Sequence, residues 1–457
     1  MRRENGYRLA TVLPMVIASA LVLGFWVGET GEIGVAIVFG ILSIAFLIWQ
    51  GPFFSFCIWL FVSPLTQGQT IDLGFGIPDL SVDRIFLLLM IMLVTSEVVS
   101  RRRRLVPLLF QDVLIIAFAV WIVVSIPFYA SPVDPPELLR MLLQWYLLPF
   151  LAYFVTRNIV TSEAALRRVL QVFLVIWFIL ALPTLVETLT GYTILGVPSE
   201  QIAGVYRVQS FMRSAWEFGT YGNMLLFLAF HSFLGGVGFW QRRLGILSLA
   251  VGLLAVLTSF MRGSWLALAG GLFVIAVLSP NRQWRRIIVL TVAIFGLLVL
   301  INWSSLPQSD VWVSRIIESE NIIARQMGLQ QLWDMFRARP LLGWGVRETM
   351  LVAQRGEVVS HISFLSNLMH FGLWGFVYLG SVLVTLWQGI RIYRGLPRER
   401  FIGKELMAIL LASATTFLIE AMTWDTNRVT SVSLLFWVVL GLIASIERLS
   451  EGKQVHA

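Results

Sequence analysis

The sequence is poor in charged residues, which make up only 13% of its 457 positions, whereas 58% are hydrophobic. A soluble domain typically carries about 25% charged residues. A soluble chain of this length would form two or three domains and would need polar side chains to cover each of them. The shortage of charge therefore excludes an ordinary soluble protein and predicts a membrane protein.

Cysteine and lysine are also nearly absent. The one cysteine, Cys57, lies within an apolar run and excludes an intramolecular disulfide framework. Only Lys404 and Lys453 are lysines, and the other basic residues are arginines in short clusters between apolar runs. Such clusters are typical of cytoplasmic loops, so the net charge of +8 does not indicate a nucleic-acid partner.

What the sequence has instead is a series of apolar segments, each near the roughly 20 residues that cross a bilayer. They lie near residues 9–27, 33–50, 53–66, 80–99, 110–130, 140–156, 166–186, 216–236, 244–259, 263–279, 287–303, 362–390, 405–422 and 429–447. Because 53–66 is short, 33–66 can also be a broken or re-entrant pair. The pattern predicts an all-α, polytopic transmembrane bundle of 12–14 spans.

The basic residues alternate between successive loops. With a cytoplasmic N-terminus, 22 of the 34 fall in cytoplasmic loops and 12 outside. The positive-inside rule therefore predicts an inner-membrane protein with both termini in the cytoplasm. The rule disfavours the twelve outer residues, and nine of these gather at Arg207 and Arg213, at Arg262, and between Arg315 and Arg355.

The long outer loop, residues 304–361, contains a helical pattern. Leu329, Leu332, Trp333 and Phe336 recur at helical spacing. We expect an amphipathic helix that lies on the membrane surface or caps a cavity.

Arg262 lies in a very short connection between two apolar segments and so close to the headgroup region. Its guanidinium could bind a lipid phosphate through two parallel hydrogen bonds. The alternative is an arginine that merely snorkels from a helix end.

Arg207, Arg213 and Glu217 form the next candidate site. The two arginines precede an apolar run that begins near Glu217. Arg213 and Glu217 are spaced for a local ion pair. Arg207 has no such partner in the sequence and is the better candidate for binding an anion.

His361 stands where the long loop enters the following span. A histidine beside arginines can act as a general base or bind an anion, although a histidine at a helix start can also simply face solvent. His370 is nine residues further on, about 13 Å deeper and half a turn around the helix, so we expect it to act mainly through packing.

Three motifs resemble those of the O-antigen ligase and polymerase family. They are Met-Arg-Gly-Ser-Trp-Leu-Ala-Leu-Ala at 261–269, Pro-Leu-Leu-Gly-Trp-Gly at 340–345, and His361 followed by Gly372 and Gly375. The likeness covers roughly 205–380. The family usually has Ser-Arg at Met261-Arg262 and His-Asn at His361-Ile362.

The resemblance implies an integral-membrane glycosyltransferase that uses an undecaprenyl-diphosphate-linked glycan. Arg207, Arg213, Arg262 and Arg339 would bind the diphosphate, with Arg262 also catalytic. His361 would assist attack by an acceptor hydroxyl, and Glu217 or Asp425 would be the next candidate bases. The acceptor would be another glycan or a lipid A-core, in polysaccharide (O-antigen or exopolysaccharide) assembly, with membrane lipids and a chain-length regulator as further partners. The outer side carries no Asp-x-Asp motif or paired His/Asp cluster, so we expect no metal and no cofactor.

The expected domains are an N-terminal bundle at 1–204, a catalytic region at 205–390, and a C-terminal hairpin with its tail at 391–457.

The rival function is a secondary transporter or flippase, which would need intramembrane charge. Glu420 is the one membrane-embedded acid of this kind. The sequence does not separate a polymerase from a ligase, although the high span count leans towards a polymerase.

Overall fold

The computed structural model describes most of the chain. The described residues are 43–66, 70–71, 80–129, 135–193, 198–202, 205–234, 239–282, 285–286, 288–289, 320–346, 362–398, 400–423, 426 and 429–451. The chain divides into two compact units, Met1–Ser55 and Phe56–Ala457. In the first unit, residues 43–50 are helical and end at Gly51, whose φ of 88° stops the helix.

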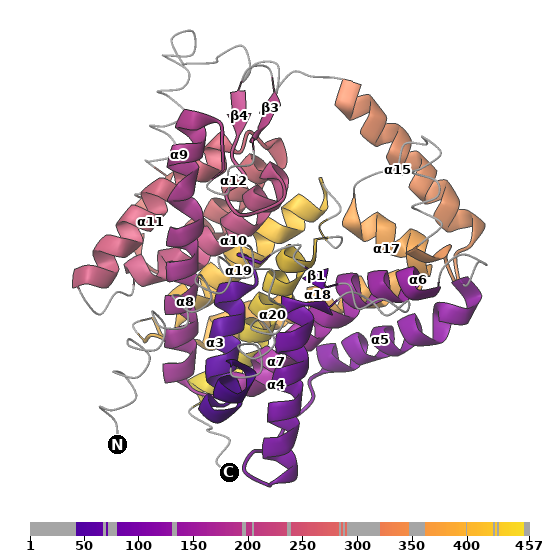
Figure 1. The fold of residues 1–457 in the computed structure, drawn as a ribbon, viewed down its shortest axis with the longest axis horizontal. Helices are drawn as coiled ribbons and strands as arrows, with labels where there is room; N and C mark the ends of the chain where they lie inside the picture. Colours follow the sequence, from indigo (N-terminus) through magenta and orange to yellow (C-terminus); the bar gives the residue numbers. More distant parts are fainter. Residues whose placement is uncertain are drawn as a thin grey trace, which may run out of the picture. The chain divides into compact units, whose positions relative to one another are not determined.

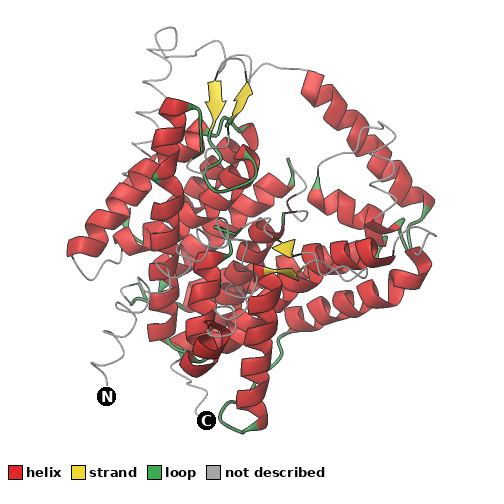
Figure 2. Ribbon diagram, in the orientation of Figure 1, coloured by secondary structure: helices red, strands yellow, loops and turns green. Residues whose placement is uncertain are grey.

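Helices form nearly all of the described structure (Figures 1 and 2). The first half of the chain contains α3 (Pro52–Val62), α4 (Val82–Val99), α5 (Phe110–Tyr129), α6 (Pro135–Leu142), the π-helix η1 (Leu143–Leu147), α7 (Leu148–Ile159), α8 (Glu163–Ala181) and α9 (Pro183–Thr190). The second half contains α10 (Ala215–Leu234), α11 (Phe239–Thr258), α12 (Arg262–Leu278), α15 (Glu320–Ala338), α17 (Ser363–Phe371), α18 (Trp374–Gly395), α19 (Lys404–Ala421) and α20 (Thr430–Ser450).

Strands are confined, in the described part of the chain, to two short antiparallel pairs. The first joins β1 (Thr70–Ile71) to β2 (Leu80–Ser81). The second joins β3 (Glu200–Ile202) to β4 (Val205–Arg207), with Gln201 opposite Tyr206. The all-α prediction is confirmed.

Five of the described helices are long and apolar enough to cross a membrane. They cover Phe110–Phe128, Leu138–Ile159, Glu163–Thr190, Trp374–Gly395 and Thr430–Ser450. Shorter apolar helices include Pro52–Val62 and Arg262–Leu278. The chain is therefore a multi-pass membrane protein. The predicted segments 9–27 and 287–303 fall almost wholly outside the described residues.

The core of the second unit is built around α20, which is apolar on all sides and is buried from Ser431 to Ile446. A helix with no polar face is stable only where other elements surround it. It packs closely on α7, and the Phe436 ring stacks on Phe417 of α19 with 3.8 Å between ring centroids. These contacts fix the helices on which the candidate site is built.

One end of the bundle gathers residues that the charge pattern places in cytoplasmic loops. Arg103 donates to the carbonyl of Asn158 at the end of α7. Arg448, at the end of α20, donates to the carbonyls of Arg157 and Val160. The ends of α4, α7 and α20 that the charge pattern predicts to be cytoplasmic therefore lie together.

Further helix ends belong to the same predicted side. Arg167, at the start of α8, lies over the Phe401 ring just before α19. His231, near the end of α10, packs against that ring. The Tyr393 hydroxyl near the end of α18 donates to the carbonyl of Leu278 at the end of α12. Each of these ends was predicted to be cytoplasmic.

The prediction of one continuous span over 362–390 is wrong. The segment forms two helices, α17 and α18, which are separated at Gly372. Gly372 has φ 59°, a conformation that other residues rarely adopt. A side chain there would also collide with the Pro340 carbonyl oxygen. The break is set by tertiary packing.

The predicted helix in the long outer loop is confirmed as α15. Leu332 is buried, whereas Gln330 and Asp334 are exposed. Trp333 departs from the expected pattern because 47% of it is exposed. Residues 304–319 and 347–361 lie outside the described part of the loop.

A buried ion pair is the basis of a stability prediction. Asp112 at the start of α5 is fully buried and pairs with Arg157, while it also accepts hydrogen bonds from Tyr153 and the Leu109 amide. Asp112→Ala would leave the buried Arg157 cation without this carboxylate and should lower the free energy of unfolding by about 3–5 kcal/mol. Equilibrium unfolding in detergent measures this loss.

The matched control is Glu163→Ala, which removes an exposed i,i+4 pair with Arg167. This change should cost no more than about 0.5 kcal/mol. Equal losses in the two variants would show that burial of the Asp112 pair contributes nothing.

Candidate functional site

The connection between α11 and α12 is the centre of the candidate site. It consists of Ser259, Phe260 and Met261, and Arg262 is the first residue of α12. Phe260 has φ 50° and is almost fully buried. Such a conformation is uncommon for a residue other than glycine and persists only where its surroundings enforce it. The tight turn presents Arg262, which is half-buried, at the end of the helix.

Arg207 reaches this turn from the β4 strand. Its Nε donates to the Ser259 carbonyl at 3.2 Å, and one terminal nitrogen contacts the Met261 sulfur. The Val208 amide also donates to the Thr258 carbonyl at 3.4 Å. The structure thus brings Arg207 to Ser259 and Met261 in the connection before Arg262, although Arg207 and Ser259 are 52 positions apart in the sequence.

The sequence-based view of Arg207 as an arginine without a local partner needs correction. The side chain is only 7% exposed, and its hydrogen bonds go to the α11–α12 turn. A strand that crosses a helical turn places the guanidinium against main-chain carbonyl oxygen, and spacing along the chain cannot reveal this. Arg207 therefore fixes the turn while adding positive charge beside it.

Glu187 is a site residue that the sequence analysis missed. It lies in α9, is fully buried, and accepts hydrogen bonds from the amides of Gln209 and Ser210 at 3.0 and 2.8 Å. The Ser199 hydroxyl donates to the same carboxylate at 2.6 Å. Glu187 thereby holds the segment that follows Arg207. The sequence offered one signal for Glu187, which is an acidic residue at the end of an otherwise apolar segment.

Arg213 and Glu217 do not form the helical i,i+4 arrangement that was considered, because α10 begins only at Ala215. The Glu217 carboxylate accepts from the Arg213 amide at 3.2 Å, and the Glu217 amide donates to the Ser214 hydroxyl at 3.4 Å. These bonds resemble a capping box. Glu217 is buried in this role, whereas the Arg213 side chain is exposed.

Glu420 lies directly behind the first turn of α12. A Cβ on Gly263 would lie 2.7 Å from Glu420 Oε2 and 2.5 Å from Thr423 Oγ1, so only glycine allows this approach. Glu420 is 1% exposed. This buried acid therefore lies against Gly263, the residue that follows Arg262.

The Pro340–Gly345 motif has a structural explanation. The Trp344 amide donates to the Met369 carbonyl at 2.9 Å, and the Leu373 amide donates to the Pro340 carbonyl at 2.7 Å. The motif thus interlocks with the α17–α18 turn through main-chain atoms. Glycine at 343 and 372 permits the close approach.

Arg339 follows α15, and its guanidinium lies over the Trp344 ring, 4.0 Å from the centroid. Of the described helices, α17 is the one against which α15 packs most closely. The observed contact of Arg339 is thus with Trp344 of the Pro340–Gly345 motif and not with the Arg207–Arg262 turn.

His370 belongs to a buried polar group. The Tyr146 hydroxyl donates to Asn367 Oδ1 at 2.6 Å and lies 3.2 Å from His370 Nδ1. Tyr146 comes from η1, and π-helical turns are frequent at functional sites. His370 thus has a polar contact in addition to the packing that we expected. His361 and Asp425 lie outside the described residues.

No group of three or more His, Cys, Asp or Glu side chains that could hold a metal occurs among the described residues.

Gly343 offers a test of the interlocked motif. It has φ 75°, and a Cβ there would lie 2.5 Å from the His370 carbonyl oxygen. Gly343→Ala should disrupt the main-chain contact, lower the melting temperature and expose the 340–345 segment to limited proteolysis. Gly395→Ala is the control because nothing lies within 4 Å of its Cβ position. An alanine at 343 that behaves like the control would contradict the interlocking.

Comparison with known proteins is informative for one segment. None of the curated proteins matches the chain. Residues 247–380 match the family model described as O-Antigen ligase. This segment contains Arg262, the 340–345 motif and the α17–α18 turn, which carry the resemblance seen in the sequence. Residues 247–380 of the chain are therefore similar to the O-antigen ligase family, the same family that the sequence motifs resemble.

Proposed function

We propose that the protein is a membrane glycosyltransferase. It transfers a lipid-diphosphate-linked glycan to a sugar hydroxyl at the outer face of the inner membrane, as a polymerase or a ligase in polysaccharide assembly. The donor lipid is undecaprenol, and the acceptor is another glycan or a lipid A-core.

The observation that carries this proposal is the contact of Arg207 with the α11–α12 turn. It places a buried cation against Ser259 and Met261, just before Arg262, and this turn lies in the segment that matches the ligase family. Guanidinium groups form paired, charge-assisted hydrogen bonds with phosphate oxygens. A turn that concentrates arginine at a helix N-terminus is well suited to a diphosphate.

The reaction that follows is a displacement at the anomeric carbon. The acceptor oxygen bonds to that carbon, the bond from the carbon to the phosphate oxygen breaks, and its electron pair leaves with the lipid diphosphate. The main demand is to stabilise charge on the leaving group. Arg262 and the exposed Arg213 would bind the diphosphate directly, while Arg207 holds the turn and adds to its positive charge.

The acceptor proton needs a base, and we assign this role to His361 on the strength of the family motif. Glu217 is a weaker candidate because its carboxylate already caps α10. Asp425 remains an alternative.

The orientation is a proposal with its own test. The cytoplasmic assignment of the arginine-rich end predicts that Ser309 and Arg398 lie on opposite sides of the membrane. Reporter fusions that are active in only one compartment should give opposite results at these two positions. The same result at both would contradict the topology.

Reconstitution tests the function. Proteoliposomes with extracted lipid-linked glycan and an acceptor glycan should yield a longer or transferred glycan together with free lipid diphosphate. A flippase, which the buried Glu420 would otherwise favour, would move the lipid-linked glycan across the bilayer with its glycosyl bond intact. Transport without release of lipid diphosphate would overturn the proposal.

A further inference from the structure

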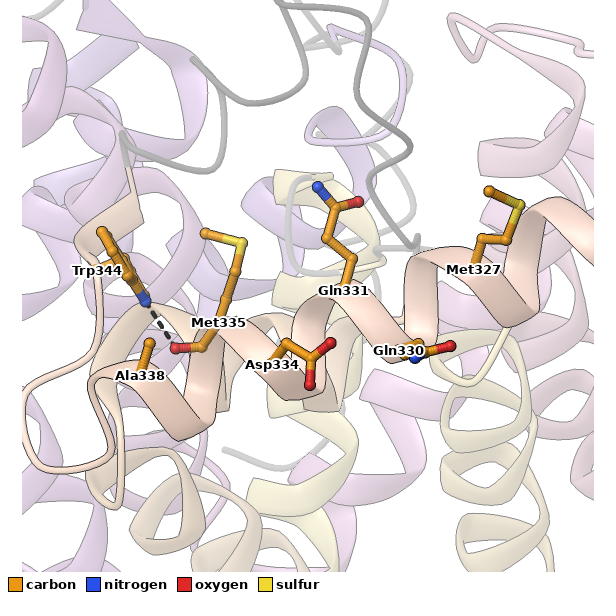
Figure 3. Close-up of a pocket in the computed structure, with 7 residues that line it drawn as sticks. All are labelled: Met327, Gln330, Gln331, Asp334, Met335, Ala338 and Trp344. Atoms are coloured by element: carbon orange, nitrogen blue, oxygen red, sulfur yellow. Dashed lines mark hydrogen bonds between the residues drawn. The ribbon is translucent and has the colours of Figure 1, made fainter.

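A shallow, open groove of about 470 Å³ runs along α15 (Figure 3). We call it the α15 groove. Its lining residues are Met327, Gln330, Gln331, Asp334, Met335, Ala338 and Trp344. Trp344 closes one end, where its indole nitrogen donates to the Met335 carbonyl at 2.7 Å.

The groove is elongated along the axis of α15. Positions 327, 331, 334, 335 and 338 recur at helical spacing, so their side chains share one face of the helix. The eleven steps of α-helix from Met327 to Ala338 span about 16 Å. An elongated ligand fits this shape better than a compact one.

The lining residues indicate which chemical class of ligand the groove can bind. Gln330, Gln331 and Asp334 offer amide and carboxylate groups that exchange hydrogen bonds with hydroxyls. Two methionines and Trp344 offer apolar faces. None of the seven lining side chains is basic, and Asp334 would repel a phosphate. An acyl chain would offer no hydrogen bond to the exposed Gln330 and Asp334 side chains. A polyhydroxylated chain, that is, an oligosaccharide, satisfies both kinds of surface.

A cation stands at the Trp344 end of the groove. Arg339 covers the Trp344 ring and also lines a second hollow of about 370 Å³ together with Phe128, Pro340, Leu341, Leu342 and Gly343. This second hollow is apolar apart from Arg339. The order along the surface is therefore an apolar hollow, a cation and a groove that carries amide and carboxylate side chains, which matches the order lipid, phosphate and sugar in a lipid-linked glycan.

None of the residues that line the two hollows belongs to the Arg207–Arg262 turn, which we assign to the donor. We propose that the α15 groove binds the acceptor glycan, with the phosphate-bearing end of that acceptor at Arg339. The inference rests on the proposed function, since it takes the donor site to be the α11–α12 turn. It adds a second, separate saccharide site.

Direct binding tests the groove without requiring turnover. The probe is the free oligosaccharide obtained by mild acid hydrolysis of extracted lipid-linked glycan. Replacing Gln330 and Asp334 together by alanine should weaken its binding about tenfold through the loss of two or more hydrogen bonds. Arg337→Ala is the matched control, because Arg337 is exposed on the same helix but does not line the groove.

A second measurement separates acceptor from donor. In the transfer assay, the double variant should raise KM for the free oligosaccharide as acceptor and leave KM for the lipid-linked donor unchanged. Unchanged oligosaccharide binding would overturn the saccharide site. A raised donor KM alone would show that the groove holds the donor. If the wild type binds the oligosaccharide but transfers nothing, the proposed function fails while the groove stands.

A third measurement addresses the phosphate end. Adding a 1-phosphate to the free oligosaccharide should strengthen its binding to the wild type. Arg339→Gln should remove that advantage and leave the affinity for the unphosphorylated form unchanged. An advantage that survives in this variant would show that Arg339 does not bind the phosphate.

Discussion

Replacing Arg262 by alanine should reduce glycan transfer by about 10²–10³-fold, the loss typical of removing one preorganised donor from developing negative charge. Expression and folding should be preserved, because Arg262 is half-buried at a helix end and does not belong to the core. The measurement is initial rate in proteoliposomes, with the melting temperature as a check on folding.

Arg262→Lys distinguishes phosphate recognition from simple charge. A lysine keeps the positive charge but cannot reproduce the planar pair of donors, so it should restore little activity. Arg282→Ala is the control, since Arg282 is exposed just beyond the opposite end of α12. Full activity in the lysine variant would show that Arg262 serves only as a charge.

Replacing His361 by alanine should remove most of the turnover, and the pH dependence should identify its role. The ordinary pKa of histidine is about 6.5, and nearby arginines would lower it by disfavouring the imidazolium. A general base must be neutral, so activity should fall as the pH drops through that pKa. If His361 instead bound the diphosphate as a cation, activity would fall as the pH rises.

The informative comparison is wild type with His361→Gln. Glutamine keeps a hydrogen-bonding side chain but does not titrate in this range. The variant should no longer show the fall in activity at low pH that protonation of histidine causes. A variant with the wild-type rate and profile would remove His361 from the mechanism and make Asp425 the next candidate base.

The sequence predicted those features that depend on local pattern. Helical spacing in the long loop predicted α15, and the apolar runs predicted membrane-spanning helices such as Thr430–Ser450. Each of these patterns lies within the helix that it predicts. The family motifs also pointed to the segment that matches the ligase model.

Features that depend on distant segments could not be predicted. Hydropathy runs without interruption through 362–390, and the break at Gly372 arises because the Pro340 carbonyl occupies the space beside it. Arg207 seemed to lack a partner because its acceptor, the Ser259 carbonyl, is a main-chain atom 52 residues away. Main-chain groups have no signature in the sequence, so neither contact could be inferred.

The most direct test of the central claim is to map where the donor headgroup binds along α12. Leu266 and Val277 are both exposed, and eleven residues place them on nearly the same face, about 16 Å apart. A photoreactive amino acid would be introduced at each position and irradiated with a lipid-linked glycan whose tail has been shortened to two isoprene units. We predict strong cross-linking at Leu266, near the Arg207–Arg262 turn, and little at Val277. Equal labelling at both positions, or labelling at Val277 alone, would contradict a diphosphate site at the α11–α12 turn.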